Sequence, residues 1–338
     1  MNPAATALIQ CSNKDCKVAE TGKCVEGHEV AVCTNYGKPL QLVEAVATEA
    51  DDVAHADVIA LPGADKLSVS MASQVLRRDA SRVIAIIGPH DAGKTSLIAG
   101  LYDLFQSGPI RDIHFRGSKT LHGFEIACHD ARAASERGTP HVIRTRRGEV
   151  QFYHLALARV TSGEELGLVL ADRAGEEYRD AADDVSLASD FVEVHRADTI
   201  ALLVDGARLA NNLTRHNVRA EIILLIQALR DGEALTRTQR LAVVLTKLDE
   251  VNASPNRDRV LRDLDTEVRR LRETCTGDFS AIEAFCVAAS PKTSAAQRGT
   301  GVSELLEFWL LQTQQVSEPM SQLPRPSRVF DRIVAVEG

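Results

Sequence analysis

Residues 88–95 of the 338-residue chain read Gly88-Pro89-His90-Asp91-Ala92-Gly93-Lys94-Thr95. The preceding Arg82–Ile87 is short, mostly apolar and β-branched, which is typical of a buried strand. The following Ser96–Phe105 carries apolar residues at helical spacing. The stretch between them fits G-x-x-x-x-G-K-[ST], a loop whose backbone N–H groups surround phosphate oxygens at a helix N-terminus. We expect Lys94 to reach the β- and γ-phosphates and Thr95 to bind Mg²⁺.

Composition narrows the class of protein. The chain is 44% apolar, so it can bury a large core, and its length suits one large domain with extensions or two domains. The net charge of −8 argues against a broad nucleic-acid surface. The sequence contains neither an apolar run long enough to span a bilayer nor the features of a secretory signal. We therefore expect a soluble cytoplasmic protein without a membrane span.

Four of the seven cysteines lie in one short polar segment: Cys11, Cys16, Cys24 and Cys33, separated by four, seven and eight residues. An odd total in a chain without a signal argues against a disulfide framework. Four thiolates can close a tetrahedral Zn²⁺ site, with His28 able to replace one thiolate. The spacing is wider than the usual C-x₂-C pair, so four reduced, metal-free thiols remain the alternative. We favour a zinc-ribbon-like extension.

Strands and helices alternate after the glycine loop, which predicts an α/β P-loop NTPase fold: a mostly parallel sheet with helices on both faces. Ligands in such folds bind at the carboxyl ends of the strands. The expected strands are Gln151–Val160, Leu166–Ala171, Thr199–Val204, Leu241–Leu245 and Ile282–Ala288, with a weaker one at Leu40–Ala47. The expected helices are Ser68–Arg78, Val185–His195, Arg219–Arg230, Arg257–Thr274 and Val302–Leu311.

Two of these helices carry further expectations. In Ser68–Arg78, Ser68 is the expected N-cap, and Val69, Met71 and Val75 are expected in the core. Arg257–Thr274 should place its arginines and acidic residues on the solvent face. The segment Ser107–Val150 has no clean periodicity and is too long for an ordinary connector, so we expect it to be functional or mobile.

The chain divides into four expected parts. Residues 1–40 form the cysteine-rich segment, and 41–81 a connecting strand and helix region. Residues 82–312 form the nucleotide domain, and 313–338 a proline-containing tail.

Polar residues follow each of two central strands. After Leu166–Ala171, Asp172 can hold Mg²⁺ through water, and Gly175 lets a backbone N–H approach the γ-phosphate. After Leu241–Leu245, Asp249 can accept two hydrogen bonds from the guanine ring N–H and amino group, which adenine lacks. Lys247 can lie along the base, and the backbone of Ser290-Pro291, after the last strand, can meet the guanine carbonyl.

Taken together, these motifs resemble the Ras-like GTPases of the TRAFAC class over about Val83–Leu311. The resemblance rests on the glycine loop, on Asp172-x-x-Gly175-Glu176 as the second switch, on Thr246-Lys247-x-Asp249 and on Ala289-Ser290. It implies that GTP or GDP with Mg²⁺ contacts Gly88, His90, Asp91, Ala92, Gly93, Lys94, Thr95, Ser96, Gly175, Thr246, Lys247, Asp249, Ser290 and Pro291.

The resemblance also implies a first-switch threonine that binds Mg²⁺ beside Thr95 and Asp172. Thr120 is our choice, with Thr139 as the alternative. Glu176 stands where the family often has the glutamine that orients the attacking water, so we expect slow turnover without a partner. Lys94, Glu176 and Thr120 are the expected catalytic residues. Thr246 replaces the usual asparagine but can still tie the glycine loop to its strand through its hydroxyl.

Two further departures concern positive charge and crowding. His90 occupies a loop position where the family has a small residue, so its side chain would crowd the γ-phosphate. Arg173 and the cluster Arg144, Arg146 and Arg147 could supply positive charge, although solvated surface positions are the default for arginine.

A narrower resemblance is to the bacterial double-GTPase family. It rests on the Cys11–Cys33 segment and on Gly117–Phe124. That family is known mainly from multi-gene systems proposed to act in conflict with phage or other invaders. The resemblance implies protein effectors or regulators as partners, and a nucleotide-dependent dimer is left open.

Three alternatives stay open at the level of sequence: a P-loop protein that binds ATP, a regulatory GTP-binding module with negligible hydrolysis, and a zinc-dependent nucleic-acid binder built on Cys11–Cys33. The net charge weighs against the third.

Overall fold

The computed structural model describes residues 64–137, 147–292 and 295–312, without the side chains of 130–137. All of these residues belong to the compact unit Leu61–Gly338. The expected zinc ligands, the expected strand Leu40–Ala47, Thr139 and the tail lie outside the described residues. Among the helices that are described, none combines the length and apolar character needed to cross a membrane.

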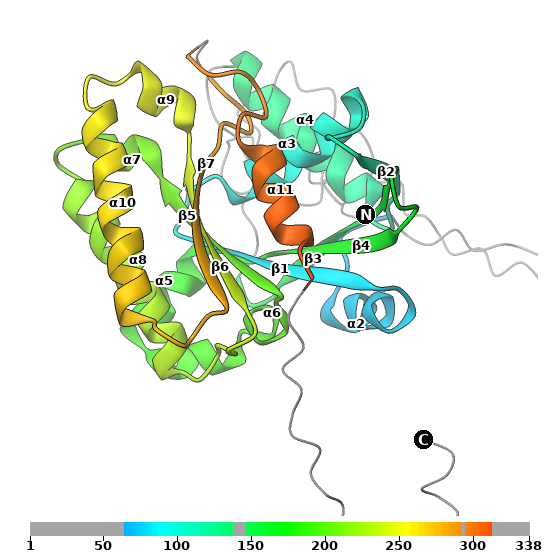
Figure 1. Ribbon diagram of the computed structural model, residues 1–338, viewed down its shortest axis with the longest axis horizontal. Coiled ribbons are helices and arrows are strands. Elements are labelled where there is room, and N and C mark those ends of the chain that lie inside the picture. The colour runs from blue at the N-terminus through cyan, green and yellow to red at the C-terminus, as the bar shows by residue number, and fades with distance from the viewer. Residues whose placement is uncertain (1–63, 138–146, 293–294, 313–338) are drawn as a thin grey trace, which may run out of the picture. The chain divides into compact units, whose positions relative to one another are not determined.

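The described strands form one seven-stranded sheet in the order β2-β3-β4-β1-β5-β6-β7 (Figure 1). The pairs from β4 to β7 are parallel, and β3 is antiparallel to both β4 and β2. The predicted α/β fold with a mostly parallel sheet is confirmed. The strands are β1 Ser81–Ile87, β2 Ile113–Gly117, β3 Gln151–Arg159, β4 Glu165–Asp172, β5 Thr199–Asp205, β6 Arg240–Thr246 and β7 Ala281–Cys286.

Helices cover both faces of the sheet (Figure 1). β1 alternates between the two: Ile84 and Ile86 pack with α3, α4 and α11, whereas Ala85 and Ile87 pack with α5, α6, α8 and α10. Burial on both sides explains the continuous apolar runs of β1, β5 and β6. The helices are α2 Val69–Arg78, α3 Lys94–Ser107, α4 Leu121–Arg137, α5 Gly175–Asp183, α6 Val192–Arg196, α7 Gly206–Ala210, α8 Arg215–Asp231, α9 Leu248–Ala253, α10 Arg257–Thr274 and α11 Val302–Leu310.

Helix α2 begins where the sequence predicted, and Ser68 caps it by accepting a hydrogen bond from the Met71 N–H. Val75 is buried, as expected, together with Ala72. The placement of Val69 and Met71 in the core was wrong, because they are 44% and 43% exposed. The apolar stripe that packs on the sheet is therefore narrower than the sequence suggested.

The segment Ser107–Val150 contains structure that its sequence did not reveal. Strand β2 is a short edge strand with an irregular register against β3, and its burial alternates between buried and exposed positions. Among the side chains of α4 that the structure describes, Phe124, Ala127 and Cys128 pack in the same core cluster as α3. The expected helix Val185–His195 is instead a 3₁₀-helix, Val185–Asp190, followed by α6.

Helix α10 has the predicted bounds, but two of its acidic residues face the protein. Asp263 and Glu267 are 6% and 1% exposed, so their placement on the solvent face was wrong. They pair with arginines of α8: Arg215 Nε lies 2.5 Å from Asp263 Oδ2, and Arg219 Nε lies 2.6 Å from Glu267 Oε1. The two helices are thus joined by charge-assisted hydrogen bonds as well as by apolar contacts.

Replacing Asp263 by Asn should lower the free energy of unfolding by about 2 kcal/mol, because it leaves the Arg215 guanidinium at the helix interface without its carboxylate. The matched control is Asp265→Asn, which breaks an exposed pair with Arg269 on the same helix. That change should cost less than about 0.5 kcal/mol. Chemical denaturation of the two variants measures the difference, and equal effects would contradict the prediction.

Candidate functional site

The glycine loop joins β1 to α3 at the carboxyl edge of the sheet. Gly93 has φ +91° and stands at the N-cap of α3, a left-handed conformation that glycine adopts without strain. Lys94 is 8% exposed, and its Nζ donates to the carbonyl oxygens of Gly88, at 2.8 Å, and Pro89, at 3.0 Å. Burial lowers the pKa of Lys94 to about 8, although the charges of Asp172, Glu176 and Asp91 oppose the shift. The ammonium group thus bonds the loop that is expected to hold phosphate.

Gly175, the first residue of α5, lies directly against this loop. A Cβ atom at Gly175 would lie 2.5 Å from the His90 nitrogen, 2.6 Å from the Pro89 carbonyl carbon and 2.7 Å from Lys94 Nζ. Only glycine allows this approach. The start of α5 and the glycine loop therefore touch so closely that position 175 has no room for a side chain.

Asp172 and Thr95 are the residues that were expected to provide oxygen ligands for Mg²⁺. Asp172 is fully buried at the end of β4, beside Ile86 of β1, and Thr95 is half-buried in the first turn of α3. A carboxylate and a hydroxyl are the hard ligands that Mg²⁺ prefers. The donor chemistry fits a magnesium ion held partly by these residues and partly by water and phosphate.

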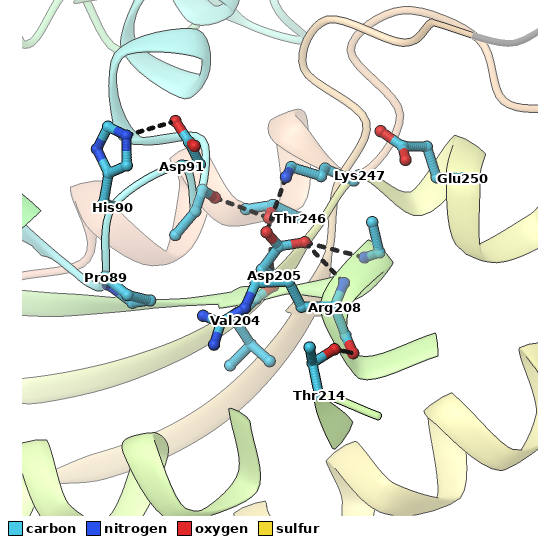
Figure 2. Close-up of polar contacts among 12 residues, drawn as sticks. Pro89, His90, Asp91, Val204, Asp205, Arg208, Thr214, Thr246, Lys247 and Glu250 are labelled. Carbon is cyan, nitrogen blue, oxygen red and sulfur yellow. Dashed lines mark hydrogen bonds and ion pairs between the residues drawn. The ribbon is translucent and has the colours of Figure 1, made fainter. Parts of the chain in front are cut away.

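Thr246 ties the loop to β6. Its hydroxyl donates to the Ala92 carbonyl at 2.8 Å and lies 3.2 Å from the Val204 carbonyl (Figure 2). The predicted hydroxyl contact, made here without the asparagine usual at this position, is confirmed. Strands β5 and β6 and the glycine loop are thus held in one arrangement.

Asp205 is a site residue that the sequence analysis missed. It ends β5, is 1% exposed, and its carboxylate lies 2.8 Å from Lys247 Nζ (Figure 2). It also accepts the backbone N–H groups of Ala207 and Arg208, at 3.0 and 3.1 Å, which caps α7. An aspartate directly after an apolar strand was the signal that singled out Asp172, and it would have found Asp205 as well.

The loops after β6 and β7 meet at Asp249. This carboxylate is 2% exposed and accepts the backbone N–H of Lys292 at 2.8 Å. Ser290 and Pro291 immediately precede Lys292, so the two loops that were expected to contact a base lie together. The N–H of Leu248 reinforces the arrangement by donating to the Val287 carbonyl at 3.1 Å.

The structure does not bring Thr120 to the glycine loop, contrary to expectation. Thr120 is fully buried, and its hydroxyl accepts the His154 N–H at 3.0 Å. His154 pairs with Val169, three positions before Asp172 and thus about 10 Å back along β4. Thr120 lies just before α4, and its hydrogen bond to His154 of β3 determines where it lies.

Arg173 is not the solvated surface residue that was expected as the default. It is 7% exposed, bonded to Glu193 at 2.7 and 3.0 Å and to Glu177 at 2.5 Å. Burial would lower the pKa of its guanidinium, but the hydrogen bonds and charge of Glu193 prevail and raise it. The charge of Arg173 is therefore neutralised by carboxylates of α5 and α6. Arg147, by contrast, is exposed and pairs with Asp180 at 3.5 Å.

Several solved GTPase structures resemble the chain at low identity. They include Roco2 RocCORdC of Methanosarcina barkeri bound to GDP, with 16% identity, a TM-score of 0.35, and coverage of 74% of this chain and 52% of that chain. The bacterial selenocysteine-specific elongation factor EF-Sec is 14% identical, with a TM-score of 0.33, and the match covers 68% of this chain and 29% of that chain. The signal recognition particle receptor SRb-GTP/SRX complex of Chaetomium thermophilum is 15% identical, with a TM-score of 0.36, and the match covers 69% of this chain and 96% of that chain. The chain thus spans about half the length of the first of these.

No curated protein matches the sequence. A protein-family model described as Double-GTPase 2 matches residues 82–310, from the first residues of β1 to the end of α11. This match covers the sheet, the glycine loop and the loops that follow the central strands, and it confirms the resemblance stated from the motifs. The chain therefore belongs to the Double-GTPase 2 family.

Proposed function

We propose that this protein is a molecular switch that binds GTP and GDP and hydrolyses GTP with Mg²⁺. The observation that carries the proposal is the meeting of Asp249 with the Ser290–Lys292 loop, at the same sheet edge as the glycine loop. Thr246 bonds directly to the glycine loop from the strand that leads to Asp249. The phosphate-binding and base-binding loops are therefore held in a fixed relation.

The phosphates would lie on Gly88–Ser96, where backbone N–H groups and the N-terminus of α3 favour negative charge. Lys94 would exchange its bonds to the Gly88 and Pro89 carbonyls for bonds to phosphate oxygens. Thr95 and Asp172 would hold Mg²⁺, which neutralises the charge that develops on the β- and γ-phosphates. Catalysis of this kind is mainly positioning and charge neutralisation.

Base selectivity would come from the second pair of loops. The Asp249 carboxylate can accept from the ring N–H and the amino group of guanine, two donors that adenine does not present together. Lys247 would lie along the base, with its ammonium held by Asp205. The Ser290-Pro291 backbone would meet the guanine carbonyl.

The γ-phosphate would be reported through Gly175 and α5. Gly175 already contacts the glycine loop, so a phosphate bound there competes for the same space. Order and disorder of such segments is a general way for GTPases to signal. We propose protein effectors or regulators as the readers of this change, within a bacterial conflict or defence system.

The remaining parts of the proposal concern organisation. A nucleotide-dependent dimer is one form that the assembly can take. We also propose that the chain divides into residues 1–40, 41–81, 82–312 and 313–338. Zinc would be held by four cysteines: Cys11, Cys16, Cys24 and Cys33.

The decisive experiment is to identify the nucleotide in the purified full-length protein, to measure zinc in the same sample, and to titrate GDP and a non-hydrolysable GTP analogue by calorimetry with Mg²⁺. We expect both nucleotides to bind. The absence of heat for either would refute the proposed function, whatever the zinc content.

A second candidate is a GTP-binding module with negligible hydrolysis. It is favoured by the Glu176 carboxylate, which repels the γ-phosphate, and by Arg173, whose charge is bound to Glu193 and Glu177. Phosphate release in a single turnover separates the two candidates, since the module would bind GTP without releasing phosphate.

Replacing Asp249 by Ala should weaken GDP and GTP binding roughly 100-fold, because two charge-assisted hydrogen bonds to the base are lost. Binding of ATP, if measurable, should not change. The control is Glu250→Ala, the adjacent carboxylate, which lies 3.3 Å from Lys292 Nζ and should leave affinity within about twofold of the wild type. Calorimetry measures both variants. Equal losses for GTP and ATP would contradict guanine recognition by Asp249.

Replacing Glu176 by Gln should increase single-turnover phosphate release roughly tenfold, because a neutral amide can orient water without repelling the γ-phosphate. Asp183→Asn removes the same charge from the other end of α5 and should leave the rate unchanged. The measurement uses Mg²⁺ and saturating GTP. A slower Glu176→Gln variant would instead assign Glu176 as a general base.

A further inference from the structure

The residues before α2 reach the site although they precede the matched residues 82–310. Leu67 exchanges two backbone hydrogen bonds with Phe152, at 2.8 and 2.9 Å, at the start of β3. The Gly123 N–H of α4 donates to the Ala64 carbonyl at 3.1 Å. The backbone on both sides of Lys66 is therefore fixed between β3 and the first turn of α4.

This backbone directs the Lys66 side chain to Asp172. Lys66 Nζ lies 3.8 Å from Asp172 Oδ2 and 5.0 Å from the centre of the Tyr153 ring. The Lys66 side chain is 26% exposed, whereas that of Asp172 is fully buried. A cation above an aromatic ring and beside a buried carboxylate is held by two attractive contacts.

The sheet register places this ammonium group on one particular side of Asp172. Tyr153 pairs with Leu170, so Tyr153 and Asp172 share the face of the sheet that α3 and α4 cover. β3 lies on the side of β4 opposite β1 and the glycine loop. Lys66 thus approaches Asp172 from β3, whereas Lys94 approaches from β1.

The charge balance at Asp172 must change when nucleotide binds. In this structure the Asp172 carboxylate is balanced by Lys66, its ion-pair partner. It also interacts with the Lys94 ammonium group, since the charge of Asp172 opposes the lowering of the Lys94 pKa by burial. With nucleotide present, Lys94 would turn to the phosphates, and Asp172 would help to hold a divalent cation. Two cations at one carboxylate repel each other strongly where water is scarce.

We propose that Lys66 is a positioning residue of the magnesium site: it neutralises Asp172 in the metal-free protein and gives way when Mg²⁺ binds with the nucleotide. The inference rests on the proposed function and deepens it. Metal binding and the Lys66–Asp172 contact are competitive, so a residue upstream of the GTPase domain responds to the occupancy of the site.

The test compares full-length Lys66→Met with Lys119→Met, whose ammonium lies 3.9 Å from Asp79 Oδ2 in a more exposed pair. Methionine keeps much of the apolar length of the side chain and removes the charge. Two quantities are measured: the Mg²⁺ concentration that half-maximally slows release of a fluorescent GDP, and the thermal midpoint with and without Mg²⁺ and GDP.

For Lys66→Met we expect about fivefold tighter Mg²⁺ binding, the range of one partly exposed ion pair. The midpoint of the metal-free, nucleotide-free protein should fall by about 2 °C, with no fall for the Mg²⁺–GDP complex. Lys66→Arg should restore the wild-type Mg²⁺ affinity and midpoints. Lys119→Met should change neither the Mg²⁺ affinity nor the difference between the midpoints with and without Mg²⁺ and GDP.

Three outcomes would overturn the proposal. An equal fall of both midpoints with unchanged Mg²⁺ affinity assigns Lys66 to packing alone. Weaker Mg²⁺ binding means that Lys66 assists the metal. Unchanged Mg²⁺ affinity without any fall of the metal-free midpoint means that Lys66 does not neutralise Asp172. If the wild type binds no GDP, the proposed function fails, while the midpoint of the metal-free variant still tests the Lys66–Asp172 contact.

Discussion

Three buried carboxylates lie along one edge of the sheet, and the site depends on how each of them is compensated. Asp172 and Asp205 are the last residues of β4 and β5, and Asp249 lies just after β6; they are 0%, 1% and 2% exposed. A buried carboxylate is costly unless charge or hydrogen bonds balance it. Lys66 balances the charge of Asp172, and Lys247 balances that of Asp205. Asp249 accepts a hydrogen bond from the backbone N–H of Lys292. Because each partner comes from a different segment, these contacts link the segments that meet at this edge. Such an arrangement contributes little to stability compared with an apolar edge, and it is where a functional site is expected.

The glycine loop lies within this arrangement and is bonded from two directions. Thr246 fixes it to β6 through the Ala92 carbonyl, while Lys94 holds the Gly88 and Pro89 carbonyls from inside. The first contact leaves the N–H groups of the loop for an anion, so it can persist when phosphate binds. The second uses the Lys94 ammonium group that is proposed to bind phosphate, so phosphate binding would exchange it. The loop would then have a fixed end and an adjustable end, and Gly175 contacts the part that would adjust.

The sequence predicted what depends on local pattern and order. β1, the glycine loop, α3, the central strands and the positions of Asp172, Thr246 and Asp249 follow from apolar runs that end in polar residues. Contacts between distant segments were not accessible in this way. Arg173 and Asp263 read as surface charges, yet each is buried by a partner from another helix. β2 carries a weak pattern because it is a short edge strand with alternating burial, and the described side chains of α4 that pack in the core are Phe124, Ala127 and Cys128. Without them, Thr120 could not be placed on β3.

The β2–α4 segment changes how the edge of this sheet is used. β2 pairs with β3 only as far as Gly117 opposite Ala156, and beyond that point the Leu67 backbone takes the free edge of β3 at Phe152. An edge strand exposes unpaired backbone groups, so the upstream segment fits where β2 ends. Gly123 makes this fit tight, since a Cβ atom there would lie 3.1 Å from the Lys66 side chain and 3.2 Å from its backbone nitrogen. The segment that carries Lys66 is thus placed by the geometry of the sheet edge rather than by attraction to Asp172 alone. A cation positioned by the backbone in this way stays close to the carboxylate even when their contact is broken, which is the condition for a reversible exchange with a metal ion.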